Sequence, residues 1–139
     1  MKNDIQYIQF AAKIEYWDKV SSFLSEFMTA NEIGGPLLEM LLISAEEIFI
    51  NIAKYAYGDP NGNVEIIAER FDNPRRLIFT FKDSGRQYNP LNMPNPNLIL
   101  KTSDREVGGL GIFIVKKNMD LVEYRYESGQ NILSIVKFF

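Results

Sequence analysis

A carboxylate and a glycine follow directly after an apolar, strand-like segment, at Asp83-Ser84-Gly85. A carboxylate at the end of a strand can accept a hydrogen bond from an exocyclic amine, such as that of adenine. The glycine two residues later lets a flat ligand approach the backbone closely, because it has no Cβ. An isolated Asp-x-Gly is a turn more often than a binding site, so this pattern has little weight by itself.

A cluster of glycines, Gly108-Gly109-Leu110-Gly111, stands directly before an apolar helical pattern. The free N–H groups and the positive dipole end of a helix N-terminus favour anions, and glycine lets phosphate oxygens approach them. The simpler alternative is a tight corner between a loop and a helix. No Lys-Ser or Lys-Thr pair follows the glycines, and the G-x-G-x-x-G spacing is absent, which disfavours a P-loop and a dinucleotide-binding fold.

A third pattern is a polar stripe on the otherwise apolar segment 36–57. Each residue of an α-helix advances by about 100°, so a carboxylate, two other polar groups and an amine align on successive turns. They are Ser44, Glu47, Asn51 and Lys54. Taken alone, the stripe is more simply a solvated helix face, whose side-chain pairs are worth a few tenths of a kcal/mol. A functional interpretation therefore needs groups from elsewhere in the chain.

The elements that must position these groups follow from the periodicity of the apolar residues. Steps of three and four predict helices over residues 16–30, 36–57 and 108–119. Strand-like runs occupy residues 5–14, 63–71, 76–82, 121–127 and 131–138, and the turn at residues 72–75 favours an antiparallel hairpin. Residues 89–107 are too long for an ordinary connection, so we expect a lid. The element order predicts an α/β (α+β) two-layer sandwich, with helices on one face of a mixed, mainly antiparallel sheet.

Composition excludes several classes of chemistry. The 139 residues are 46% hydrophobic, so we expect a single globular domain over residues 1–139. The absence of cysteine and histidine rules out disulfides, thiolate zinc sites, cysteine nucleophiles and histidine acid–base catalysis. The net charge of −3 gives no general attraction to nucleic acid or anionic lipid. Because no signal peptide or membrane-spanning run is recognisable, we expect a cytoplasmic location with no membrane and no direct nucleic-acid partner.

Taken in chain order, the three patterns resemble the N, G1 and G2 boxes of the Bergerat ATP-binding fold of gyrases, Hsp90, MutL and sensor histidine kinases, the GHKL superfamily. More closely, residues 44–57, 83–90 and 105–120 look like the anti-sigma regulatory factor serine/threonine kinases of the RsbW and SpoIIAB type. The similarity covers almost the whole chain and includes its length, its element order and the lid. It implies a histidine-kinase-like ATP-binding fold, with the nucleotide between the long helix, the lid and the glycine turn.

The resemblance implies specific roles for the matching residues. Asn51 binds Mg²⁺ and through it the phosphates of ATP, which suits an amide oxygen. Glu47 acts as the general base on an incoming hydroxyl. Asp83 binds the adenine amine and is helped by Ser134.

Around the phosphates, the resemblance implies contacts from the backbone of residues 108–111 and charge balance from Arg105 and Lys54. In-line phosphoryl transfer depends mainly on positioning and charge stabilisation, so this sparse set is chemically sufficient. The implied nucleotide-binding residues are Asn51, Lys54, Asp83, Gly85, Tyr88, Arg105, Gly108, Gly109, Leu110, Gly111 and Ser134.

The function implied by the resemblance is that of a Mg-ATP-dependent serine/threonine protein kinase and anti-sigma factor. Such a protein phosphorylates a STAS-type anti-anti-sigma protein, sequesters a sigma factor when free of it, and can form a homodimer. One alternative is a nucleotide-gated protein-binding module without kinase activity. Another is an interaction domain in which the three patterns coincide by accident of helix and turn composition.

Overall fold

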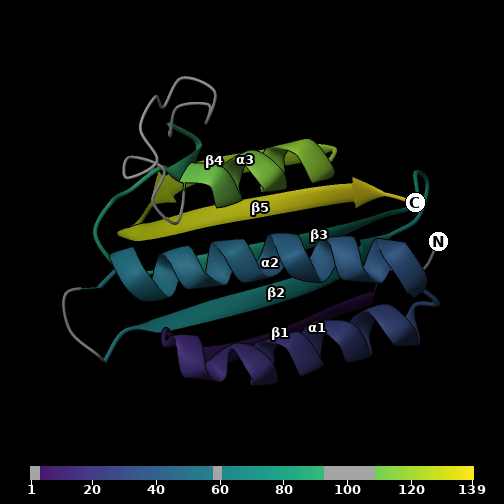
Figure 1. The fold of residues 1–139 in the computed structure, drawn as a ribbon, viewed down its shortest axis with the longest axis horizontal. Coiled ribbons are helices and arrows are strands. Elements are labelled where there is room, and N and C mark those ends of the chain that lie inside the picture. Colours follow the sequence, from purple (N-terminus) through teal and green to yellow (C-terminus); the bar gives the residue numbers. More distant parts are fainter. Residues whose placement is uncertain (1–3, 58–60, 93–108) are drawn as a thin grey trace.

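The structure, a computed structural model, describes residues 4–57, 61–92 and 109–139. The elements follow one another along the chain as shown in Figure 1. They are β1 (Asp4–Ala11), the 3-10 turn η1 (Ile14–Tyr16), α1 (Trp17–Ala30), α2 (Gly35–Tyr55), β2 (Asn63–Phe71), β3 (Arg76–Asp83), the 3-10 turn η2 (Pro90–Asn92), α3 (Gly109–Asn118), β4 (Leu121–Glu127) and β5 (Gln130–Phe138).

The strands form a single sheet in the order β1-β2-β3-β5-β4. Each pair of neighbouring strands is antiparallel, so the described strands include no parallel pair and form an antiparallel sheet instead of the mixed, mainly antiparallel one expected from the sequence. The three helices lie on the same face of this sheet, with α2 between α1 and α3 (Figure 1). The predicted two-layer α+β architecture with helices on one face is confirmed.

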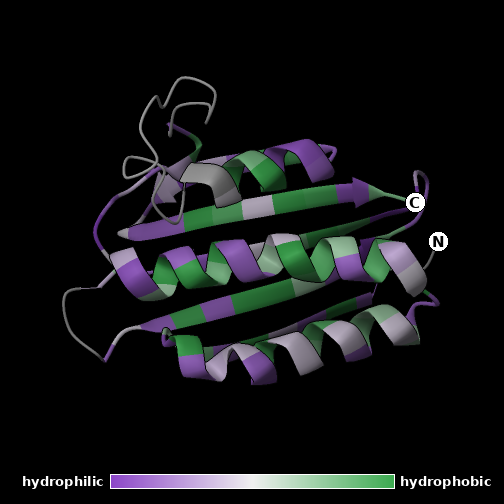
Figure 2. Ribbon diagram, viewed as in Figure 1, coloured by the Kyte–Doolittle hydropathy of each residue, from purple (hydrophilic) through white to green (hydrophobic). Residues whose placement is uncertain are grey.

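The core lies between the sheet and the helices. Alternate residues of the central strands face the helices and are almost completely buried, namely Val64, Ile66 and Ala68 of β2 and Leu77, Phe79 and Phe81 of β3. Figure 2 shows the central strands as predominantly hydrophobic and the last turn of α3 as hydrophilic. Burying one large apolar side chain is worth about 1.5–3 kcal/mol, so this layer supplies most of the driving force for folding. Among the described residues, no helix is long and apolar enough to cross a membrane.

Two element ends differ by more than one residue from the sequence prediction, each for a local reason. The first strand ends at Ala11 instead of residue 14, because its partner β2 begins at Asn63, the residue opposite Ala11. The long helix ends at Tyr55 instead of residue 57. Its last carbonyl groups accept hydrogen bonds from Arg86 in the turn after β3, which replaces continued helical bonding. Of the predicted lid, residues 93–107 lie outside the described part of the chain.

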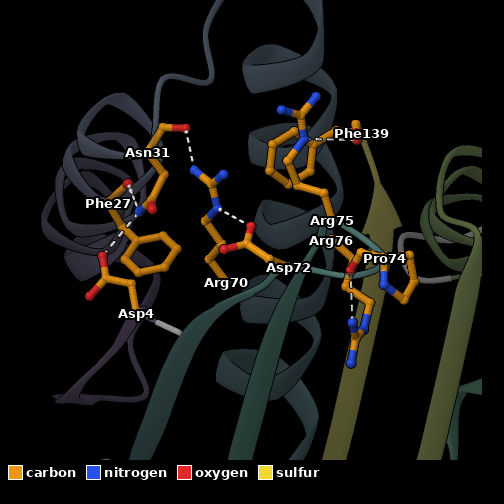
Figure 3. A network of polar contacts seen from close by, with 9 residues as sticks. All are labelled: Asp4, Phe27, Asn31, Arg70, Asp72, Pro74, Arg75, Arg76 and Phe139. Atoms are coloured by element: carbon orange, nitrogen blue, oxygen red, sulfur yellow. Dashed lines mark hydrogen bonds and ion pairs between the residues drawn. The ribbon is translucent and has the colours of Figure 1, made fainter. Parts of the chain in front are cut away.

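The end of the sheet near the β2–β3 hairpin is fastened by polar contacts (Figure 3). The side-chain amide of Asn31, after α1, donates to the Asp4 carboxylate at 3.2 Å, and the backbone carbonyl oxygen of Asn31 accepts from the Arg70 guanidinium at 3.2 Å. The Arg75 guanidinium lies 4.8 Å from the centre of the Phe139 ring. These contacts join β1, α1, the hairpin and the end of β5 far from the patterns described above.

Candidate functional site

A pocket lies at the opposite end of the sheet, where β3 ends and β5 begins, against the C-terminal half of α2. Apolar side chains from four elements line it, including Ile48, Phe81, Ile112 and Leu133. Its polar lining includes Asn51, Asp83, Arg86, Tyr88, Tyr124 and Asn131. An apolar cavity with a few convergent polar groups is typical of a small-molecule site. The pocket thus brings together three of the residues expected from the sequence, Asn51, Asp83 and Tyr88.

The Asp83 carboxylate is buried in this pocket, with 5% of the residue exposed. Burial raises its pKa, while hydrogen bonds from the Asn131 side chain and the Gly85 backbone partly lower it. Both bonds go to Oδ1 at 2.9 Å. Oδ2 has no hydrogen-bond partner among the described residues, and the carboxylate forms no ion pair there. Asp83 therefore offers one free acceptor to a ligand.

The turn after Asp83 is held against the end of α2. The Ser84 N–H donates to the Tyr57 hydroxyl at 2.7 Å, and the Arg86 N–H donates to the Ala56 carbonyl at 2.8 Å. A Cβ on Gly85 would overlap the Ala56 carbonyl group. Glycine is thus required here because two backbone segments are in contact. The sequence pattern alone indicates a different reason for this glycine, the close approach of a flat ligand.

The sequence interpretation missed Asn131, the second residue of β5. It lies directly opposite Asp83 in the antiparallel pairing and is 6% exposed. Its side-chain amide donates to Asp83 Oδ1, and its Oδ1 accepts from the Tyr124 hydroxyl of β4 at 2.5 Å. The only sign of this residue in the sequence is that a polar side chain stands at the start of an apolar strand. Its position opposite Asp83 depends on the strand register, which the sequence does not show.

Asn51 presents a buried oxygen without a partner. The residue is 7% exposed, and its Oδ1 has no hydrogen bond among the described residues. Buried side-chain oxygens are normally paired, and an unpaired one costs about 1–3 kcal/mol, so this atom is suited to a ligand or a cation.

The donor set around Asn51 fits Mg²⁺ carried by a nucleotide. Mg²⁺ usually takes one or two protein oxygens and completes its shell with phosphate oxygens and water. The described residues contain no group of three or more acidic side chains that could hold a metal ion by themselves. A hard cation at Asn51 would therefore take its remaining ligands from phosphates and water.

Glu47 lies one helical turn before Asn51 and contacts α3. Burial raises the pKa of its carboxyl, the neighbouring Glu46 raises it further, and Lys54 lowers it. A Cβ on Gly111 would overlap a carboxylate oxygen of Glu47. The missing Cβ of Gly111 thus leaves room for the Glu47 carboxylate against the first turn of α3, a tertiary role that the sequence did not reveal.

The remaining predicted residues are placed differently. Lys54 is exposed at the end of α2, and Gly109 and Leu110 begin α3. Arg105 and Gly108 lie outside the described residues.

The structure does not bring Ser134 to the pocket. Leu133 of β5 lines the cavity, so the next side chain along the strand points to the other face of the sheet. There the Ser134 hydroxyl is 2.9 Å from that of Thr80. The expected help from Ser134 to Asp83 is therefore corrected: the β5 side chain that bonds to Asp83 is Asn131.

Comparisons with known proteins identify a family and a similar fold. The sequence pattern of the histidine kinase-like ATPase domain matches residues 10–137. The fold is similar to the crystal structure of the RsbU and RsbW domains of Rv1364c from Mycobacterium tuberculosis, with a TM-score of 0.70 and 11% sequence identity. The similarity covers 97% of this chain but only 32% of that one. No curated protein matches the chain.

The family match spans both the helix that carries Asn51 and the strands that carry Asp83 and Asn131. The matched range, residues 10–137, therefore includes the segments that form the pocket. The chain belongs to the histidine kinase-like ATPase domain family.

Proposed function

We propose that the chain is a Mg-ATP-dependent serine/threonine protein kinase and anti-sigma factor, which phosphorylates a STAS-type anti-anti-sigma protein and sequesters a sigma factor. The observation that carries the kinase assignment is the Glu47 carboxylate one turn from Asn51 on the same helix. The family supports ATP as the nucleotide. The fold likeness to a protein with an RsbW domain supports a regulatory role of this type.

Different residues in the described part of the chain serve different steps of phosphoryl transfer. Asp83 Oδ2 accepts a hydrogen bond from the adenine amine, and apolar side chains such as Ile48 and Ile112 enclose the base. The unpaired Asn51 Oδ1 would hold Mg²⁺, which would neutralise charge on the phosphates. These contacts position the nucleotide, which is the main requirement of this reaction.

Glu47 then serves as the general base. A serine or threonine hydroxyl of the partner attacks the γ-phosphorus, the bond to the leaving ADP oxygen breaks, and the hydroxyl proton passes to the Glu47 carboxylate. Burial and Glu46 raise the pKa of Glu47, which makes its carboxylate a stronger base than an exposed glutamate. Its place against Gly111 puts the base beside the start of α3, where phosphates are favoured.

Replacing Glu47 with glutamine tests this assignment. With labelled ATP and the cognate antagonist, we expect Glu47→Gln to transfer phosphate at least about 100-fold more slowly than wild type, since general-base catalysis contributes factors of this size. Its nucleotide affinity should change little. Glu39→Gln, an exposed site on the same helix, is the matched control and should transfer at the wild-type rate.

Two outcomes would count against the proposal. Unchanged transfer by Glu47→Gln would remove Glu47 from the role of base. A wild-type chain that binds nucleotide and captures its partner without transferring phosphate would instead be a nucleotide-gated binding module.

A further inference from the structure

The side chain of Asn131 uses its full hydrogen-bonding capacity inside the pocket wall. Its Nδ2 donates to Asp83 Oδ1 at 2.9 Å and to the Arg86 carbonyl at 2.8 Å. Its Oδ1 accepts from the Tyr88 N–H at 3.1 Å and from the Tyr124 hydroxyl at 2.5 Å. A side-chain amide has two N–H donors and an oxygen with two lone pairs, so no group is left for a ligand.

These four bonds connect three parts of the pocket. Asp83 ends β3, Arg86 and Tyr88 belong to the turn that follows, and Tyr124 lies in β4 at the edge of the sheet. On the other side, the same turn is bonded to the end of α2 through Ser84 and Arg86. Asn131 therefore connects β5 and β4 by hydrogen bonds to the turn after β3, and this turn is also hydrogen-bonded to the end of α2.

The bonds also determine which Asp83 oxygen is available. Oδ1 is occupied by the Gly85 N–H and by Asn131, and the pairing of β3 with β5 fixes Asn131 directly opposite Asp83. Because two donors bind Oδ1 from different directions, rotation of the Asp83 carboxylate would break at least one of these bonds. Buried polar networks of this kind fix a single arrangement when every member is satisfied.

We propose that Asn131, supported by the Tyr124 hydroxyl, is a positioning residue that orients the Asp83 carboxylate and leaves Oδ2 as its single acceptor for the amine of a bound base. The proposal rests on the proposed nucleotide site and adds residues that set its selectivity. A base with an amine at this point gains a bond to Oδ2. A base with a carbonyl oxygen there would face the carboxylate, and two acceptors without a proton repel each other.

The same contact influences the protonation of Asp83. Burial raises the pKa of this carboxyl, and the bond from Asn131 lowers it. Loss of that donor moves the pKa further upward, so Asp83 becomes protonated at a higher pH. A role for Asn131 that is confined to filling space, without the bond to Asp83, predicts no change of this kind in a folded variant.

The test compares wild type with Asn131→Leu, Asn131→Thr and Tyr124→Phe, with Tyr126→Phe as the matched control. The first variant removes the amide and keeps the branched shape of the side chain, the second restores a hydroxyl donor toward Asp83, and the third removes only the supporting hydroxyl. Tyr126 lies on the same strand as Tyr124 and is 40% exposed. The readouts are the carbon-13 titration of the Asp83 carboxyl without nucleotide, and the affinities for Mg-ATP and Mg-ITP against pH.

We expect Asn131→Leu to shift the Asp83 titration to higher pH and to weaken Mg-ATP binding at least about tenfold, the value of one bond to a charged group. Its loss should be larger at acidic pH, and its preference for Mg-ATP over Mg-ITP should fall. Asn131→Thr should recover part of both properties, Tyr124→Phe should show smaller shifts in the same direction, and Tyr126→Phe should match wild type.

An unchanged Asp83 titration in folded Asn131→Leu would overturn the proposal. If that variant does not fold, wild-type behaviour of Tyr124→Phe in both titration and selectivity would overturn it instead. A wild-type chain that binds neither nucleotide refutes the nucleotide site, whereas the Asp83 titration still decides the role of Asn131.

Discussion

Replacing Asp83 with asparagine should weaken Mg-ATP binding at least about 100-fold, because the site is left with a buried group that cannot pair with the base. In the variant, the amide oxygen can accept the bonds from Gly85 and Asn131 that now go to Oδ1. Its NH₂ group then takes the place of Oδ2 and meets the amine of adenine as donor against donor. Calorimetric titration with Mg-ATP measures this loss.

The same substitution should make the nucleotide-free chain more stable at neutral pH. Burial raises the pKa of Asp83 in the folded state above its unfolded value. A raised carboxyl pKa means that folding favours the protonated form, so the stability present below the unfolded pKa is lost as pH rises through the folded pKa. Asparagine stays neutral, so the gain in stability should be present at pH 7 and disappear at acidic pH.

Urea unfolding of both proteins at neutral and acidic pH measures this difference. Asp72→Asn, at the far end of the sheet, is the control and should leave Mg-ATP affinity unchanged. An Asp83→Asn protein that binds Mg-ATP as wild type does would show that Asp83 does not contact the base.

Gly85→Ala should lower the free energy of unfolding by about 2–3 kcal/mol or more, within the range for overpacked sites with a lost hydrogen bond. A Cβ there overlaps the carbonyl group of Ala56, which is backbone and cannot rotate away. The turn must move, which breaks the bond from the Arg86 N–H to Ala56 and displaces Asp83. Mg-ATP binding should therefore fall together with stability.

Gly34→Ala is the matched control for this substitution. A Cβ at Gly34 meets nothing within 4 Å, and its φ of −151° is extended backbone that alanine adopts freely. Its cost should be about 0.5 kcal/mol, from an alanine at the start of α2. Equal stability losses for the two variants in urea unfolding would contradict the close approach at Gly85.

The helix-borne part of the site could be predicted from the sequence because helix geometry is local. Glu47 and Asn51 are four residues apart, and a rotation of about 100° per residue places them together whatever the rest of the chain does. The strand bounds were also largely predictable from the alternation and turn residues. Their order in the sheet comes from packing between distant segments, which the sequence pattern does not show.

The β5 contribution could not be predicted for an identifiable physical reason. Apolar residues occur on both faces of this strand, with Leu133 and Ile135 on one face and Ile132 and Val136 on the other, all buried. Alternation then gives no sign of which side chains face the pocket, and a shift of one residue exchanges the faces. The pattern therefore gives no ground to choose Asn131, which the structure places at Asp83, over Ser134, which the family resemblance implies there.

Gly111 shows a similar limit. A glycine before an apolar helix predicts phosphate binding by local rules alone. Its contact with Glu47 depends on how α3 packs against α2, and only the folded chain reveals that the missing Cβ makes room for a carboxylate.

We propose that one nucleotide binds through a cation held by Asn51 and a base held by Asp83. Calorimetric titration of the chain with ATP, first with Mg²⁺ and then with excess EDTA, tests it most directly. We predict one nucleotide per chain with Mg²⁺, an affinity at least about tenfold weaker in EDTA, and no response to EDTA in Asn51→Ala. Absence of binding at millimolar nucleotide, or equal wild-type affinities with and without Mg²⁺, would contradict the account.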